Sequence, residues 1–304
     1  MATIRSNHNV SAWIILFSAC CVVLLLCGCR PAETETRLVV AVSLEPQAFL
    51  VDRIGGDRVR SVVVVVPAGR EPENYQPTPE KVAALCKAKA WFQTGMPFEM
   101  TLRPKLVSLA PTMKFVDLRQ RVPLRKLELH THVHNEEHVG CCDEEGNDAH
   151  IWMGPSALKT QVETILTAFI ELDPSGEPEY RLNTETFLGE IEETRLAIAE
   201  ILQPHRGKNV FVFHPAYGYF CDEFDLRQHA IEFEGKSPSA KQLADLVALA
   251  KQEQEPPTIF VQPEFNRGPA DAIAEATGGL CVVHSPLERN VLANMRQLAE
   301  MIAR

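Results

Sequence analysis

The chain has 304 residues, a length sufficient for two domains of ordinary size. Hydrophobic residues make up 45% of it and charged residues 23%, a composition typical of a globular protein rather than a disordered one. The formal net charge is −10 at pH 7, which excludes nucleic acid binding through a basic surface.

The amino-terminal segment has the pattern of a secretory signal. The apolar run from Val10 to Leu26 is short for a membrane-spanning helix and typical of a signal-peptide core. The Leu-Cys-Gly-Cys that follows resembles a bacterial lipobox, which predicts cleavage after residues 1–28 and a lipid on Cys29. An uncleaved membrane anchor is the alternative. Either way, we expect the rest of the chain to lie outside the cytoplasm, with residues 29–37 as a tether.

Beyond the tether, apolar strands alternate with helical stretches. Strands are predicted at 38–43, 59–67, 89–95 and 113–118, and helices at 46–56 and 79–88. The run at 59–67 is continuous and β-branched, as in a strand covered on both faces. Strands spaced by helices predict a parallel sheet.

Two long helical patterns then separate this region from a second alternation. The patterns cover 156–172 and 179–203. After them, the predicted strands are 209–215, 230–235, 258–265 and 279–286, and the predicted helices are 237–252, 268–277 and 285–304. The predicted fold is therefore α/β, with two parallel-sheet lobes at 38–175 and 205–304 bridged by one long rigid helix at 176–204.

Four potential metal ligands follow predicted strands or precede a helix. They are Glu73, His150, His214 and His284, the last beside Ser285. Ligands bind beyond the carboxyl ends of strands in open parallel sheets. Three histidines and a carboxylate at such positions have the composition of a metal site. Glu264 and Glu234 are structural in the simplest interpretation, although either could supply a missing oxygen.

Six stretches, in order, resemble the solute-binding lipoproteins of bacterial zinc and manganese ABC importers. They are FLVDRIGGDRV, PENYQPTP, DAHIWMGP, VFHPAYGYF, IEFEGKSPSAKQL and HSPLERNVLANM. The resemblance implies two lobes bridged by a rigid helix, a metal site in the cleft between them, and no enzymatic activity.

The same resemblance implies a ligand set. His150 and His214 fall on metal ligands of the family. Glu73 stands where the family usually has histidine, and Ser285 stands where it usually has aspartate. We therefore expect Glu73 to replace an imidazole, and either His284 or water to fill the place of the missing aspartate.

A second group of metal-binding residues lies in a polar loop at 128–149. His134 to His138 match the H-x-x-E-H pattern of zinc peptidases, but the flanking residues offer no apolar face to anchor a helix. We interpret the loop as an accessory that binds soft cations weakly, as the resemblance also implies, and expect deletion of 130–148 to spare the tight site. Its ligands are His130, His132, His134, His138, Cys141 and Cys142.

The predicted function is a receptor that captures Zn2+ as transported cargo and presents it to the membrane subunit of an ABC permease. Mn2+ or Fe2+ is the alternative cargo, because Glu73 makes the site harder. A secreted zinc metalloenzyme and a surface adhesin are the alternatives from other classes, and the sequence offers no adhesive module. We expect a monomer that is lipid-anchored on the periplasmic or extracytoplasmic face and binds no nucleic acid.

Overall fold

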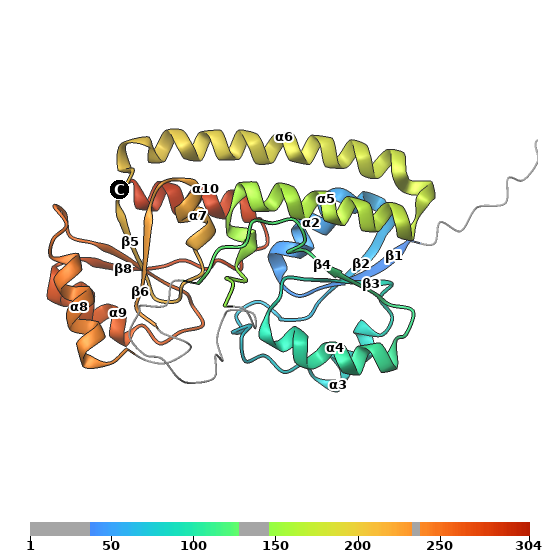
Figure 1. The fold of residues 1–304 in the computed structure, drawn as a ribbon, viewed down its shortest axis with the longest axis horizontal. Coiled ribbons are helices and arrows are strands. Elements are labelled where there is room, and N and C mark those ends of the chain that lie inside the picture. The colour runs from blue at the N-terminus through green and yellow to red at the C-terminus, as the bar shows by residue number, and fades with distance from the viewer. Residues whose placement is uncertain (1–36, 128–145, 233–237) are drawn as a thin grey trace, which may run out of the picture. The chain divides into compact units, whose positions relative to one another are not determined.

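The computed structural model describes residues 37–127, 146–232 and 238–304. In these ranges the chain forms two parallel four-stranded sheets, one before and one after a long helix (Figure 1). The predicted α/β fold class is confirmed. None of the helices in these ranges has the length and apolar content needed to cross a lipid bilayer.

The sheet of the amino-terminal lobe has the strand order β2-β1-β3-β4. Valine-rich β1 lies inside the sheet and pairs with β2 and β3, so its side chains are almost all buried. The run at 59–67 was predicted to be covered on both faces; β2 is an edge strand whose last three valines pack against the core and are partly buried, so this cover is partial. The bounds are β1 Leu38–Val42, β2 Val59–Val64, β3 Ala90–Gln93 and β4 Lys114–Asp117.

Four helices belong to this lobe: α2 Glu45–Gly55, α3 Pro79–Leu85, α4 Pro97–Leu109 and α5 Pro155–Leu172. Each has proline in its first turn, where the missing N–H leaves no helical hydrogen bond unmade. The sequence pattern did not predict α4, because Pro104 interrupts the helical hydrogen bonds and the apolar stripe is weak.

Helix α6, Glu177–Leu202, connects the two lobes. Along one face it packs against α2 and α5 in its amino-terminal half and against α10, Val291–Ile302, in its carboxyl-terminal half (Figure 1). Its buried side chains recur at helical spacing, and all except Thr184 join one continuous apolar core with both lobes: Tyr180, Thr184, Phe187, Ile191, Ile198 and Leu202.

The carboxyl-terminal lobe has the strand order β6-β5-β7-β8. Its elements are β5 Asn209–Val212, α7 Gly218–Glu223, β6 Arg227–Ala230, α8 Ala240–Ala250, β7 Thr258–Val261, α9 Gly268–Thr277 and β8 Leu280–Val283. A smaller apolar core joins this sheet to α8 and α9.

Three features of this lobe differ from the prediction. Helix α10 begins at Val291 rather than at residue 285, after the cap residue Asn290. Strand β6 begins three residues earlier than predicted, because pairing with β5 recruits the polar residues Arg227 and Gln228. Helix α7 was not predicted, since six residues are too few to display a helical period.

Candidate metal centre

Three of the predicted ligands meet at the carboxyl ends of the strands. Glu73 lies in the loop between β2 and α3, His150 directly precedes the short helix Ile151–Met153, and His214 lies two residues beyond β5. One ligand atom from each residue lies within 4.8 Å of the other two, and this is the one such group found in the described residues.

The geometry of the cluster is compact. The Nε2 atoms of His150 and His214 are 3.1 Å apart. Glu73 Oε1 lies 3.1 Å from Nε2 of His214 and 3.9 Å from Nε2 of His150. The histidines are 2% and 4% exposed, so an ion held here would be removed from bulk water.

The other ring nitrogen of each histidine contacts a carboxylate. His150 Nδ1 lies 2.7 Å from Asp148 Oδ1, and His214 Nδ1 lies 3.2 Å from Glu232 Oε2. A carboxylate at this position fixes the proton on Nδ1 and leaves the Nε2 lone pair for a metal. Neither carboxylate was predicted from the sequence to be functional. The only available signal was the spacing of Asp148 two residues before His150.

The charges of the cluster favour a cation. Burial alone raises the pKa of Glu73, but the charge of His214 and hydrogen bonds with both imidazoles hold that pKa below its usual range. Burial lowers the pKa of His214, yet Glu73 and Glu232 outweigh it and raise this pKa to about 10. For His150, Asp148 and Glu73 likewise outweigh burial, and the pKa is raised. Near neutral pH, the raised pKa of His214 favours its protonated form in the metal-free cluster. A proton then occupies the position where a metal would bind.

One oxygen of Glu73 has no partner among the described residues. Oε2 is buried and makes no hydrogen bond, whereas Oε1 contacts the histidines. A buried carboxylate oxygen left unpaired is costly. A bound divalent ion would satisfy it, so the donor set fits a metal.

His284 does not join the cluster, contrary to the expectation that it could substitute for the missing aspartate. Its Nδ1 lies 3.1 Å from the Tyr217 hydroxyl and its Nε2 lies 3.4 Å from the Asn294 carbonyl. Burial lowers its pKa to about 4, which describes a neutral core histidine. Ser285 Oγ accepts a hydrogen bond from Leu287 N and so belongs to the turn.

A small cavity of about 20 Å3 adjoins the three ligands. Phe265 stacks on the His214 ring at 5.2 Å, and Trp152 lies 5.2 Å from the His150 ring. Glu71 and Glu264 also line the cavity, and burial raises the pKa of both. A buried water needs at least about 10–15 Å3, so the cavity has room for one.

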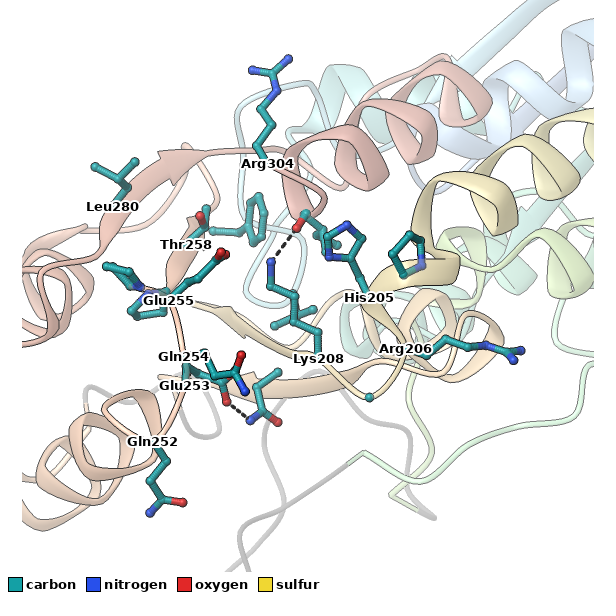
Figure 2. A pocket seen from close by; sticks show the side chains of 18 residues that line it. His205, Arg206, Lys208, Gln252, Glu253, Gln254, Glu255, Thr258, Leu280 and Arg304 are labelled. Atoms are coloured by element: carbon teal, nitrogen blue, oxygen red, sulfur yellow. Dashed lines mark hydrogen bonds between the residues drawn. The ribbon is translucent and has the colours of Figure 1, made fainter.

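A larger groove lies at the opposite ends of the carboxyl-terminal strands (Figure 2). It is lined by the first residues of β5, β7 and β8. Two contacts between polar groups cross it: Lys208 donates to the Ile302 carbonyl, and Asn209 contacts Glu253. Within the described part of the chain no three-ligand group occurs there, so the groove is not the metal site.

The remaining predicted site residues lie outside the described residues. These are Cys29, Glu234 and the loop ligands His130, His132, His134, His138, Cys141 and Cys142.

Comparison with known proteins identifies the family. A model of the family described as "ZnuA: Zinc-uptake complex component A periplasmic" matches residues 40–304. The chain belongs to this family. The ZnuA of Yersinia pestis is 26% identical over 255 residues, 78% of this chain and 79% of that protein. The manganese-binding lipoprotein MntA of Halalkalibacterium halodurans is 24% identical over 272 residues, 84% and 83% of the two chains.

A solved structure titled "Crystal structure of ZnuA" is similar throughout. It is 33% identical, with a TM-score of 0.79, over 88% of this chain and 98% of that chain. Members of the ZnuA family are binding components of ABC metal-uptake systems and not enzymes. The protein is therefore a periplasmic or extracytoplasmic metal-binding component of an ABC importer, and it has a permease partner.

Proposed function

We propose that the cargo is Zn2+, bound by Glu73 Oε2 or Oε1 and by Nε2 of His150 and His214. The observation that carries this proposal is the convergence of two buried imidazoles and a carboxylate with an unpaired oxygen. Imidazole and carboxylate are ordinary zinc ligands, and three protein ligands plus one water form a common tetrahedral set.

The size of the adjoining cavity supports zinc over manganese. Room for one water gives four ligands in total, whereas Mn2+ is typically surrounded by an oxygen-rich octahedral set. Two imidazole nitrogens among three protein ligands also suit zinc better than manganese. Relatives described as zinc-uptake proteins agree with this choice.

Metal content is the direct test. Protein purified without added metal should contain one equivalent of zinc by elemental analysis. Competition against a chelator should give a Zn2+ affinity far above that for Mn2+. Equal or higher affinity for Mn2+ would contradict the proposal.

Manganese or iron is the second candidate cargo, because one observation favours it. Glu73 provides an oxygen anion where the family usually has imidazole, which makes the site harder. A relative described as a manganese-binding lipoprotein also favours manganese as the cargo. Growth of a strain lacking the protein would separate the candidates: rescue by added zinc alone supports zinc, and rescue by manganese or iron alone supports the second candidate.

We also propose that the protein works as a lipid-anchored monomer. Residues 1–28 would be removed and Cys29 would carry the lipid, which keeps the receptor near its permease. The ligands at 130–142 would bind further Zn2+ weakly and raise its local concentration. Mass spectrometry of the membrane fraction tests the anchor, and a Cys29→Ala variant should appear in the soluble fraction.

A further inference from the structure

A short antiparallel stem lies directly before the ligand His150. Asp148 N donates to the Arg125 carbonyl at 2.9 Å, and Leu127 N donates to the Gly146 carbonyl at 3.1 Å. Between these two bonds, Lys126 and Asn147 form an isolated bridge. The stem thus places Arg125 opposite Asp148, the carboxylate that contacts His150.

The Arg125 side chain lies between two carboxylates from different lobes. Its Nη1 is 2.9 Å from Asp148 Oδ2, and its Nε is 2.8 Å from Asp222 Oδ2 on α7. The Arg125 side chain is 10% exposed and that of Asp148 is fully buried. Because the other Asp148 oxygen contacts His150, an unbroken series of contacts runs from the carboxyl-terminal lobe to a metal ligand.

Helix α7 has a glycine where the Arg125 guanidinium approaches it. A Cβ atom at Gly218 would lie 1.9 Å from Arg125 Nη1, so the position has no room for a side chain while Arg125 keeps its place. The Tyr219 hydroxyl donates to the Asp148 carbonyl at 3.0 Å. Gly218 therefore leaves room for Arg125, and Tyr219 contacts the segment that carries His150.

We propose that Arg125 is a positioning residue for metal binding: it orients Asp148 behind His150 and ties both to the lobe that carries His214. The inference rests on the proposed function, because it assumes that the cluster binds a divalent metal. A planar guanidinium can engage both carboxylates in fixed directions, which a lysine cannot do. Its positive charge also compensates the buried Asp148.

The neighbouring residue of α7 provides a matched control. Glu223 accepts hydrogen bonds from Ser156 N at 2.9 Å and from Ser156 Oγ at 2.8 Å. This contact also crosses between the lobes and is exposed, but it does not reach a metal ligand. Asp222→Asn and Glu223→Gln thus remove similar charges and differ in whether the contact leads to His150.

The experiment combines Zn2+ affinity with the visible spectrum of the Co2+-loaded protein, whose bands report ligand geometry. Arg125→Met should weaken Zn2+ binding about 10-fold, as for other groups that orient metal ligands, and should shift the Co2+ bands. Asp222→Asn should weaken binding about 3-fold and shift the same bands. Arg125→Lys should recover part of the affinity, and Glu223→Gln should match the wild type in both measurements.

Thermal unfolding of the metal-free variants measures any loss of stability separately. If Arg125→Met does not fold, Asp222→Asn and Gly218→Ala carry the test, since Gly218→Ala displaces the guanidinium without altering a charge. The inference is overturned if these variants bind within twofold of wild type with unchanged Co2+ bands, or if Glu223→Gln reproduces their effects. Failure of the wild type to bind Zn2+ would instead overturn the proposed function.

Discussion

The Nε2 atoms of His150 and His214 lie 3.1 Å apart, close to the separation that a shared zinc ion requires. Two nitrogens bonded tetrahedrally to one Zn2+ at 2.0–2.1 Å would be about 3.3 Å apart. The imidazoles are thus held near their liganding positions by Asp148 and Glu232, and binding needs little rearrangement of these two rings.

The Glu73 carboxylate should contribute strongly to affinity. Glu73→Ala should weaken Zn2+ binding about 10- to 1000-fold, roughly 1.4–4 kcal/mol, because it removes the anionic ligand. Glu73→His should retain zinc and bind Mn2+ relatively worse. Competitive chelator titration measures both, with Glu71→Ala as the control from the same cavity wall. If Glu73→Ala bound Zn2+ with wild-type affinity, Glu73 would not be a metal ligand.

Zinc binding should release about one proton at pH 7–8. One Nε2 must carry a proton to contact the other at 3.1 Å, and the pKa of His214 is raised to about 10. Below that pH the metal-free site is protonated, so affinity should rise about tenfold per pH unit towards pH 10. Unperturbed histidines would show this effect only below about pH 6.5. Calorimetry in buffers of different ionisation enthalpy counts the protons, and a count of zero at pH 7.5 would refute this assignment.

Removal of the accessory loop should leave tight Zn2+ binding intact, but fewer residues can be removed than the sequence suggested. Deleting 130–148 would remove Asp148 and half of the stem, and should therefore damage the tight site. Replacing 128–145 by Asn-Gly should preserve it, because that dipeptide suits a two-residue antiparallel turn. Calorimetric titration should show that only the weak Zn2+ sites disappear. Loss of tight binding in a folded protein would contradict this separation.

Helix α6 contains an exposed glycine with no packing role. A Cβ at Gly189 would meet nothing within 4 Å, and glycine inside a helix is about 1 kcal/mol less favourable than alanine. Gly189→Ala should therefore increase the free energy of unfolding by about 0.5–1 kcal/mol, measured by urea denaturation of the metal-free protein. Gly154→Ala is the contrasting variant, because its Cβ would lie 2.9 Å from the Tyr219 side chain. A destabilised Gly189→Ala would show that the position needs glycine.

The sequence predicted the parts of the fold that depend on local pattern. Valine-rich β1 and the amphipathic α6 follow from residue spacing alone. Strand β6 was predicted too late, because its polar residues become a strand only by pairing with β5. Helix α4 was missed because packing of Leu102 and Leu106 stabilises it despite Pro104.

The three ligands were predictable from their places after strands or before a helix and from the family resemblance, which also singled out His150. His214 and Glu73 follow strands, and the structure brings them together with His150. Residues that support the ligands come from distant segments, so spacing could not reveal them: Arg125 and Asp222 are 97 positions apart. His284 follows β8, but its ring lies between Tyr217 and α10 rather than facing the cluster.

Helix α6 packs without interruption on both lobes, which limits how a permease can recognise a loaded receptor. A large separation of the lobes would break the packing contacts between α6 and one lobe. It would also expose apolar core residues to water. Loaded and empty forms should therefore have nearly the same outline. The permease then has to distinguish them by a small surface near the cluster, where the Glu73 loop either holds an ion or does not. We therefore expect docking to depend on the conformation and charge of this loop rather than on an opening and closing of the whole molecule.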